Sequence, residues 1–535
     1  MRFGILIFIL FLISGNLPAQ SESLQVSLEP VAMDQLDGIQ SYAFGQHESY
    51  WLIIGGRLDG LHRRQPWATF LPDGQNKLLT VVQPEQKQVY YAPLTSLSLP
   101  LQDQLSSTNM QFFQEGNTLY LIGGYGHSET VGSKVTYAML TAVDVPGLIN
   151  AIIQQTDIAP YFRTLTDTEF AVAGGQLKKI YDTYYLLGGH HFEGDYNPMN
   201  HATFTQTYTN AVRRFHIEDN GIDIIPTFLP AWVDTAAFHR RDYNAGEVIL
   251  PNGEEGIMNF SGPFQVDADL PYLNTTSIDS QGYEVVQGFA QYFNNYHCPH
   301  IPLYSNDQEE MHTLFFGGIA QYYEEAGNLV QDNDVPFVKT ITRVTRDRTG
   351  QMTEYKLPVE MPDYLGAGAE FIPLTNLPVF SNGVIRLDEL PEDQTLIGYL
   401  FGGIRSTAAN IFWTNDGTQS EAHPIVYEVW LSRQETSAID IPNEQSYNGL
   451  QMQIFPNPND GYFNINFSIE QPTEVHLRIT SGDGNILVNE NITQQVFIGQ
   501  NHLERNIKPF HVNGIYFVTL ITSDQQATQK IIVKP

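Results

Sequence analysis

The sequence predicts an all-β protein in which one sheet-forming unit recurs six times and a small β-sandwich follows. The first observation is that five hydrophobic runs end in a glycine pair, with a degenerate sixth copy at Ser261-Gly262. Recurrence over tens of residues is typical of repeat architectures. The second observation is a set of short alternating strands after Leu450. The complete pairs begin at Gly55, Gly123, Gly188, Gly317 and Gly402.

Residues 1–20 have the features of a secretory signal peptide. Arg2 gives a basic start, an apolar stretch covers residues 5–13, and Leu17-Pro18-Ala19 is a cleavage-like end. The apolar stretch is too short to cross a bilayer, and no other segment approaches the length of a transmembrane helix. We therefore expect the mature chain to leave the cytoplasm without a transmembrane segment. A retained membrane anchor is the less favoured alternative.

Each glycine pair is preceded by a hairpin pattern. The clearest copy has strand-like residues at 109–114, a turn at Glu115-Gly116-Asn117 and a second strand at 118–122. A further strand-like stretch follows each pair after a variable loop, as at 211–217 and 425–431. Each unit within residues 21–435 therefore predicts an antiparallel sheet of about four strands.

Six such sheets bury both their faces if they pack radially around an axis, as the blades of a β-propeller do. Glycine suits the end of an inner strand, because it has no Cβ and adopts positive φ readily. The alternating residues Leu24, Val26 and Leu28 predict an N-terminal strand. We expect this strand to pair with the last unit near residues 425–431 and so close the ring.

The hydrophobic run, the glycine pair and a later strand carrying Tyr427 and Trp430 resemble the kelch repeat. The resemblance covers about residues 24–435 and implies a six-bladed kelch-like β-propeller over residues 21–435. Two features depart from the family pattern. The aromatic residues that follow the pair are scattered in the other units, and Ser261 replaces a glycine. The units are also longer than a compact kelch blade, so the excess residues are expected in loops.

A stretch of linker composition at 436–449 precedes a second domain at 450–535. Its apolar and polar residues alternate at 463–467 and 475–479, and further strand-like stretches lie at 515–520 and 530–533. A turn sequence, Ser481-Gly482-Asp483-Gly484, separates two of these stretches. The pattern predicts a small C-terminal β-sandwich.

This second domain contains three ordered motifs, whose residues are Pro456, Asn457, Pro458 and Gly461, then Gly514 and Tyr516, and finally Lys530. Together they resemble the type A C-terminal sorting domain of the type IX (Por) secretion system. The resemblance implies that residues 450–535 engage the type IX secretion machinery, and that the protein is extracellular or attached to the outer-membrane surface. An ordinary appended sandwich is the alternative.

Composition excludes some functions. Acidic residues outnumber basic ones 59 to 27, which gives a net charge of −32. Such a chain repels phosphate backbones, so we expect no nucleic-acid partner. Cys298 is the only cysteine, which excludes an intramolecular disulfide.

The loops that follow the glycine pairs should gather on one face of the ring, and they are rich in aromatic and histidine residues. Aromatic rings cover the flat faces of sugars or peptides, while His and Arg side chains provide directional hydrogen bonds. The alternative is that these side chains only pack the loops. The candidate ligand-binding residues are Arg57, Tyr125, His127, His190, His191, Tyr322, Tyr323 and Arg405, and His62, Phe192 and Phe264 lie in the same loops.

No cofactor is predicted, although two acidic pairs, Asp267/Asp269 and Asp332/Asp334, leave calcium open. Neither pair has the complete spacing of a known calcium loop. Two further stretches contain potential zinc ligands but match no zinc signature, so we interpret them as loop residues. They are His190, His191, Glu193 and Asp195, and His297-Cys298-Pro299-His300.

These observations favour an exported, non-catalytic module that binds a glycan or a protein or mediates adhesion. The sequence has no nucleophile elbow, phosphate-binding glycine loop or zinc-protease helix motif. One alternative is an enzyme acting on sugars, such as an epimerase resembling the sialic-acid mutarotases. Its acid and base groups would come from Glu193, Asp195, His190 and Arg405. A structural surface component is the other alternative.

Overall fold

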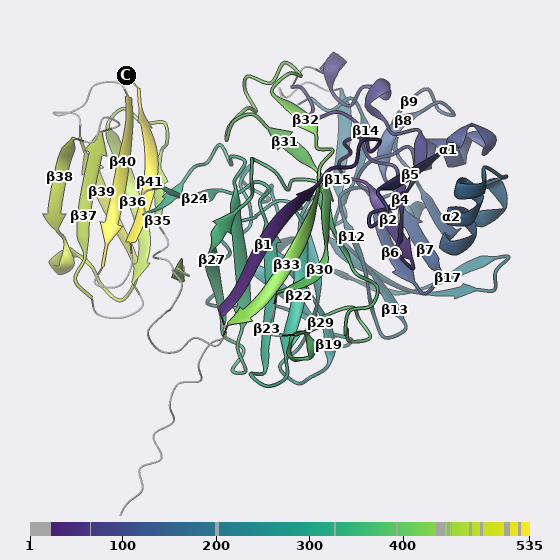
Figure 1. The fold of residues 1–535 in the computed structure, drawn as a ribbon. Helices are drawn as coiled ribbons and strands as arrows, with labels where there is room; N and C mark the ends of the chain where they lie inside the picture. Colours follow the sequence, from purple (N-terminus) through teal and green to yellow (C-terminus); the bar gives the residue numbers. More distant parts are fainter. Residues whose placement is uncertain are drawn as a thin grey trace, which may run out of the picture.

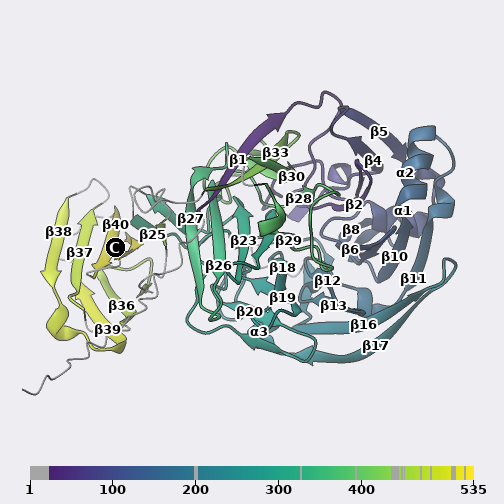
Figure 2. The same cartoon turned by 60° about the horizontal axis from the view of Figure 1, so that its bottom comes forward.

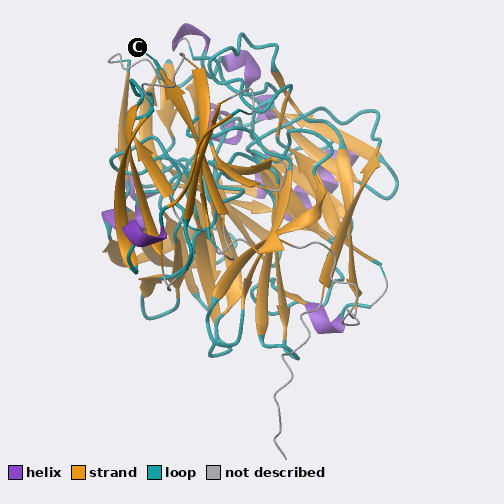
Figure 3. Ribbon diagram, turned by 90° about the vertical axis from the view of Figure 1, so that its left-hand side faces the viewer, coloured by secondary structure: helices purple, strands orange, loops and turns teal. Residues whose placement is uncertain are grey.

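The computed structural model describes residues 23–64, 66–197, 203–325, 328–391, 394–434, 445–446, 450, 452–469, 473–481, 485–507, 514–522 and 526–534. The predicted signal peptide, most of the predicted linker and the turn at 482–484 lie outside these residues. Strands dominate the fold (Figure 3). We call residues 23–434 the body and residues 450–534 the tail.

The described part of the body contains six sheets, each built on four antiparallel strands, that follow one another in chain order (Figures 1 and 2). The first three are β2 (Ala43–His47), β3 (Tyr50–Ile54), β4 (Leu78–Gln83) and β5 (Gln88–Pro93); β6 (Gln111–Glu115), β7 (Thr118–Ile122), β10 (Met139–Asp144) and β11 (Phe162–Thr166); and β12 (Gln176–Ile180), β13 (Thr183–Leu187), β16 (Ala211–Asp219) and β17 (Ile224–Val233).

The fourth to sixth sheets repeat this plan, and the fifth gains two short strands. They are β18 (Asn244–Ile249), β19 (Glu255–Phe260), β20 (Thr275–Ile278) and β21 (Tyr283–Val285); β22 (His300–Ser305), β23 (Glu310–Phe316), β26 (Thr340–Arg346) and β27 (Met352–Glu360), extended by β29 (Ile385–Arg386) and β34 (Gln445–Ser446); and β28 (Ala369–Pro373), β30 (Thr395–Gly402), β33 (Val426–Gln434) and β1 (Ser23–Val31).

The sixth sheet joins the two ends of the body. Strand β1 pairs antiparallel with β33, from Ser23 opposite Gln434 to Val31 opposite Val426. The predicted pairing of the N-terminal strand with the last unit is therefore confirmed. In Figure 2 the six sheets lie around a common centre, with β1 and β33 between β27 and β5.

A closed cycle of backbone hydrogen bonds lies at the start of the first strand of each sheet. Among the described residues six N–H groups take part, and each donates to the carbonyl oxygen of the residue at the matching place in the preceding sheet, at 2.7 to 3.1 Å. The N–H of Ser41 in the first sheet donates to the sixth sheet, so the cycle has no free end. The cycle runs through Ser41, Asn109, Gly174, Asp242, His297 and Gly368.

The glycine pairs connect each sheet to the next one. The second glycine of each pair donates its N–H to a carbonyl oxygen of the following sheet, as Gly124 does to Val172 at 2.9 Å. The first glycine has positive φ, and a Cβ at Gly123 would lie 1.9 Å from the same Val172 oxygen. The predicted role of the pairs, close approach at positive φ, is confirmed. In the degenerate unit Gly262 donates to Asn295 in the same way, and Ser261 adopts φ 46°.

The hydrophobic core is divided between successive sheets. Each sheet contributes one face to a cluster with the preceding sheet and the other face to a cluster with the following one. Trp51 and Ile53 of β3, for example, pack against Tyr399 and Phe401 of β30, whereas Leu52 and its neighbours face the second sheet. Because every sheet is covered on both faces, its strands are apolar on both sides.

Helices are few and short in the described residues. They are α1 (Leu99–Leu105), α2 (Val145–Gln154) and α3 (Thr235–Phe238), with short 3₁₀ turns at Pro66–Ala68, Pro72–Gly74, Leu94–Ser96, Ala159–Tyr161, Thr168–Phe170, Leu387–Glu389 and Thr493–Gln495. Asp144 caps the N-terminus of helix α2, because its side chain accepts the Gly147 N–H, and the helix packs against the first and second sheets. No helix in the described ranges is long and apolar enough to cross a membrane.

Four of the loops that follow the glycine pairs carry a small second hairpin in the described residues. Three of these hairpins form two-stranded sheets of their own, and the fourth joins the sheet of the tail. The hairpins are β8 (Tyr125–Ser128) with β9 (Ser133–Thr136), β14 (His190–Gly194) with β15 (Phe204–Tyr208), β31 (Ile404–Ser406) with β32 (Ser420–Ala422), and β24 (Tyr322–Glu325) with β25 (Asn328–Gln331).

The tail consists of two sheets that share one hydrophobic core. Alternating side chains such as Phe463, Ile465 and Phe467 are buried, and the residues between them are not, as the sequence pattern predicts. One sheet has the order β35 (Met452–Phe455), β36 (Tyr462–Ile469), β39 (Gly499–Asn506). The other has the order β41 (Gln526–Val533), β40 (Gly514–Ile521), β37 (His476–Ser481), β38 (Ile486–Asn491), and β25 and β24 extend it beyond β41.

Candidate ligand-binding pocket

The loops that follow the glycine pairs border a pocket next to the hydrogen-bonded cycle that joins the six sheets. Its volume is about 190 Å³. Residues from loops of several sheets line it, as expected for a site built where repeated loops converge. The lining side chains are mainly aromatic: His62, Phe70, Tyr125, His190, Phe192, Tyr196, Phe264, Tyr296 and Phe412, together with Leu61, Arg64, Asn109, Ala173, Arg241, Asp242, Ile319 and Ile404.

The floor of the pocket is polar and belongs to the hydrogen-bonded cycle. Asn109 and Asp242 both have positive φ, and the Asn109 amide donates to the Asp242 carboxylate at 3.3 Å. Arg241 forms an ion pair with Asp242 and donates from Nε to the Tyr208 hydroxyl at 3.1 Å. Burial alone would lower the pKa of Arg241. The negative charge of Asp242 acts in the opposite direction and the pKa is raised overall, so this guanidinium stays charged. The ring of Phe264 covers it at 4.1 Å.

The walls are aromatic rings in edge-to-face and stacked contacts. Phe70 meets the edge of Tyr125 with ring centroids 5.5 Å apart, and Tyr125 meets Phe192 at 5.1 Å. Phe192 stacks on Phe204 at 4.8 Å and lies 6.0 Å from Tyr196. The Tyr125 hydroxyl donates to the Gly194 carbonyl at 2.6 Å, which fixes its ring. These contacts hold the aromatic rings of the pocket walls in place before a ligand binds.

Two histidines of the pocket are neutral at physiological pH. Burial lowers the pKa of His62 to about 4, and its ring lies 4.9 Å from Phe70. Burial also lowers the pKa of His190, with a further contribution from the Arg241 charge. The Gln206 side-chain nitrogen lies 2.6 Å from His190 Nδ1. Both rings therefore offer hydrogen-bonding groups without adding charge.

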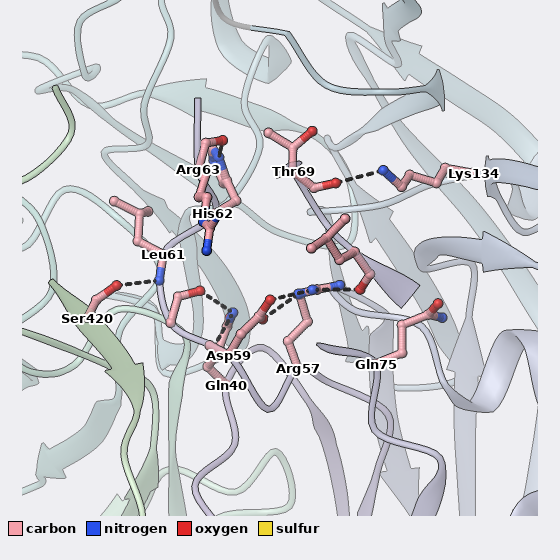
Figure 4. A network of polar contacts seen from close by, with 12 residues as sticks. Gln40, Arg57, Asp59, Leu61, His62, Arg63, Thr69, Gln75, Lys134 and Ser420 are labelled. Carbon is pink, nitrogen blue, oxygen red and sulfur yellow. Dashed lines mark hydrogen bonds and ion pairs between the residues drawn. The ribbon is translucent and has the colours of Figure 1, made fainter. Parts of the chain in front are cut away.

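The loop that carries His62 and Phe70 is held from both sides (Figure 4). Arg57 donates to both carboxylate oxygens of Asp59 and to the carbonyl oxygen of Leu71 at 3.0 Å. On one side the Lys134 ammonium donates to the Thr69 carbonyl at 2.6 Å; on the other, the Ser420 hydroxyl accepts the Leu61 N–H at 2.9 Å. These bonds keep the loop in place without a ligand.

At the rim of the pocket, Arg64 lies over the exposed ring of Trp413. The guanidinium carbon is 3.6 Å from the ring centroid. Trp413 is 69% exposed, so the pair extends the aromatic surface toward solvent. Arginine stacked on tryptophan presents both a flat apolar face and hydrogen-bond donors.

The structure brings together some of the candidate residues predicted from sequence. Tyr125 and His190 line the pocket, as do His62, Phe192 and Phe264. Arg57 lies behind the wall: it is 2% exposed and anchors the loop through Asp59.

The other candidates lie away from the pocket lining. His127 faces Glu129 at 3.9 Å, and His191 points to the opposite side of β14 from His190 and faces Glu193 at 3.1 Å. Arg405 pairs with Glu421 at 3.1 Å. Tyr322 packs against Tyr292, and Tyr323 follows it on β24, in the hairpin that joins the tail.

Sequence reasoning missed several lining residues, because the loops that carry them differ in length and have no repeating pattern. Arg241 and Asp242 had one signal, a pair of adjacent arginines at 240–241 in a strongly acidic chain. Phe70, Tyr196, Tyr296 and Phe412 had none.

A second cavity, of about 310 Å³, lies on the other side of the polar floor, since Asn109 and Asp242 line both cavities. Two ion pairs face it, Lys178 with Glu247 at 3.1 Å and His297 with Glu370 at 3.1 Å. Burial lowers the pKa of His297, but the charge and hydrogen bond of Glu370, together with the Asp242 charge, outweigh burial and raise it. The positive and negative groups of this cavity are thus already paired with each other.

The potential metal ligands do not converge. Within the described ranges no group of three or more His, Cys, Asp or Glu side chains is placed to hold a metal ion. Asp195 pairs with Lys134 and Asp332 with Lys530, so these carboxylates are engaged by ammonium groups. Cys298 is buried and faces the Asn244 amide.

Residues 453–534 match the family described as the secretion system C-terminal sorting domain. This match confirms the predicted sorting domain. The tail marks the protein for export through the type IX system, to the cell surface or beyond it. A search of curated proteins finds no match.

Solved structures resemble the chain only distantly. The structure of YjhT is 9% identical in sequence, and the alignment covers 73% of this chain and 100% of the YjhT chain, with a TM-score of 0.39. The exo-β-1,3-galactanase of Phanerochaete chrysosporium with galactose is 11% identical, with 81% of this chain and 98% of that one covered and a TM-score of 0.26. A family 43 arabinoxylan arabinofuranohydrolase of Bacillus subtilis with cellotetraose is 9% identical, with 93% and 96% covered and a TM-score of 0.27.

Proposed function

We propose that the body is a six-bladed kelch-like β-propeller and that its aromatic pocket binds a carbohydrate outside the cell. Support for the propeller comes from the closed cycle of hydrogen bonds and from the core clusters between successive sheets. The glycine-pair contacts repeat between the same neighbours. These three features repeat at the same places in each unit, as a radial assembly of identical units requires.

The observation that carries the proposed ligand is the combination of aromatic walls with a charged floor. Aromatic rings stack on the apolar faces of sugar rings, and polar groups at the base accept and donate hydrogen bonds to hydroxyls. Asp242 offers acceptors, whereas Arg241 and Arg64 offer donors. Each of these groups is fixed by its neighbours before a ligand arrives, so little ordering entropy is lost on binding.

A glycan array screened with the mature full-length chain tests this proposal. We expect binding to a defined set of sugars, and a loss of about tenfold or more in affinity for Tyr196→Ala, since an aromatic contact contributes about 1 kcal/mol beyond its area. The matched control is Trp67→Ala, which removes a ring that is 79% exposed and lies outside the pocket. Equal binding by both variants would exclude the pocket.

The other outcomes distinguish the alternatives. Conversion of a bound sugar, followed by NMR, would favour the enzyme. Of the acid and base groups proposed from sequence, His190 lines the pocket, whereas Glu193, Asp195 and Arg405 are paired elsewhere. If the protein binds no sugar on the array, a protein ligand or a structural role at the cell surface would be favoured.

A further inference from the structure

The β24–β25 hairpin of the body differs from the other small hairpins, because it extends a sheet of the tail. Strand β25 pairs parallel with β41, with Val330 opposite Thr528 and Gln331 opposite Gln529. Figures 1 and 2 both show the hairpin between the body and the tail. The fifth unit thus uses its glycine-pair loop for a contact that the other small hairpins in the described residues do not make.

The hairpin is rooted firmly in the body. Tyr322 and Leu329 are buried in a cluster with Tyr292 and Phe293, and the Tyr322 and Tyr292 rings lie 4.9 Å apart, edge to face. Glu324 on the same hairpin pairs with Lys356 of β27 at 3.4 Å. These contacts hold β25 in one orientation. A strand needs such an orientation to add to the edge of another sheet.

Side chains reinforce the pairing of the two strands. The Lys530 ammonium and the Asp332 carboxylate lie 2.5 Å apart, and their side chains are 20% and 10% exposed. The Gln526 amide donates to the Asn328 side chain at the other end of the contact. Gln529 and Thr528 of β41 are buried as well. An ion pair that is mostly shielded from water is costly to break on one side only, so it favours this register.

The pairing covers two features of the tail. The last residues of β41 already bond to Asn457 and Asn459 of the tail. Without β25, however, the first part of β41, around Thr528 and Gln529, would be an open edge that invites other strands. Lys530 belongs to the terminal motif of the sorting domain, which the family match includes. The hairpin therefore covers both the open first part of β41 and the lysine of the motif.

We propose that the β24–β25 hairpin is a docking surface on the body for the last strand of its own tail, Gln526–Val533. Docking keeps Lys530 covered in the intact chain, and any partner that engages this strand competes with the hairpin. The connection between body and tail, at residues 435–449, is short, so the local concentration of the tail at the hairpin is high and a small contact suffices.

A disulfide trap tests the contact. The natural Cys298 is buried, so a double variant Val330→Cys with Thr528→Cys should form one internal crosslink under mild oxidation. The control, Val330→Cys with Glu490→Cys, places the second thiol on β38, across the sheet from β41, and should stay reduced. Absence of the first crosslink, or equal crosslinking in both variants, would overturn the proposal.

A second measurement does not depend on engineered cysteines. Labelling of Lys530 by an amine reagent, followed by mass spectrometry, should be several-fold faster in full-length Asp332→Asn than in the natural chain. The matched control is Glu325→Gln, which removes a charge from an exposed position of the same hairpin. Equal labelling in the natural chain and Asp332→Asn, or an equal increase in both variants, would contradict docking.

Discussion

Glu354 is a carboxyl group buried in the body, and no cation among the described residues forms an ion pair with it. Its oxygens accept the backbone N–H groups of Tyr292 at 2.6 Å and Phe293 at 3.3 Å. Burial raises its pKa from 4.5 to about 8, although the two hydrogen bonds act in the opposite direction. At neutral pH the group is therefore mostly protonated, so it satisfies buried N–H groups without burying a charge.

This pKa predicts a pH-dependent stability. Because the folded-state pKa is raised, the contribution of Glu354 is fully present below pH 4.5 and is lost as the pH rises through about 8. Relative to Glu354→Gln, the natural protein should lose up to about 1.4 kcal/mol of unfolding free energy per pH unit in this range. Urea unfolding at a series of pH values measures both proteins. Parallel curves would show that Glu354 is ionised in the folded state.

Cys298 is a single thiol at a buried position beside the hydrogen-bonded cycle. Burial raises its pKa to about 12, and the Asn244 side chain only partly opposes this. Since the thiolate is the reactive form, native protein at neutral pH should not react with a chromogenic disulfide reagent. Unfolding in concentrated guanidinium chloride should release one thiol per chain. Fast reaction of the native protein would show that this region opens.

At the scale of the elements, the glycine pair explains why each unit ends as it does. The first glycine has positive φ, and any Cβ there would meet a carbonyl oxygen of the next sheet. That oxygen accepts the N–H of the second glycine, as Val172 does from Gly124. The close approach of the two sheets and the hydrogen bond from the second glycine therefore depend on each other. Ser261, which replaces the first glycine in the fourth unit, also adopts a positive φ.

Two glycines separate this effect from simple backbone strain. Gly123→Ala should lower the unfolding free energy by about 3 kcal/mol or more, since the Cβ would lie 1.9 Å from the Val172 oxygen and push the sheets apart. Gly116→Ala should cost about 1 kcal/mol, because its φ is also positive but nothing lies within 4 Å. Thermal and urea unfolding compare the two. Similar losses would show that the sheet contact contributes little.

The elements were far more predictable than the pocket. The strand–turn–strand pattern predicted a strand at residues 118–122, where β7 (Thr118–Ile122) lies. The alternation of apolar and polar residues predicted that Phe463 and Ile465 are buried. These signals are local, because a turn or an alternating strand is encoded in adjacent residues. Tyr196 and Phe412 reach the pocket from irregular loops, and only tertiary packing brings them together. Tertiary packing also decides the position of Arg57. It pairs with Asp59 and does not line the cavity.

At the scale of the whole molecule, closure of the body depends on one strand from the far end of the sequence. Strand β1 supplies Leu24 and Val26 to the core between the fifth and sixth sheets, and it pairs with β33 along its full length. Without it, β33 would become an edge and this core would be open to water. Burying two such side chains contributes about 3 to 6 kcal/mol, before any hydrogen bond is counted.

A chain that begins at Asp34 should therefore unfold at a markedly lower temperature than the mature chain. The control is a chain that ends at Gln434: it loses the whole tail but keeps the four strands of every sheet, and its main transition should move by only a few degrees. Scanning calorimetry measures all three. If the chain lacking β1 does not fold alone, a synthetic peptide of residues 23–31 should restore it, because the register with β33 is complete within that segment. Equal transitions for the mature chain and the chain starting at Asp34 would mean that β1 does not close the body.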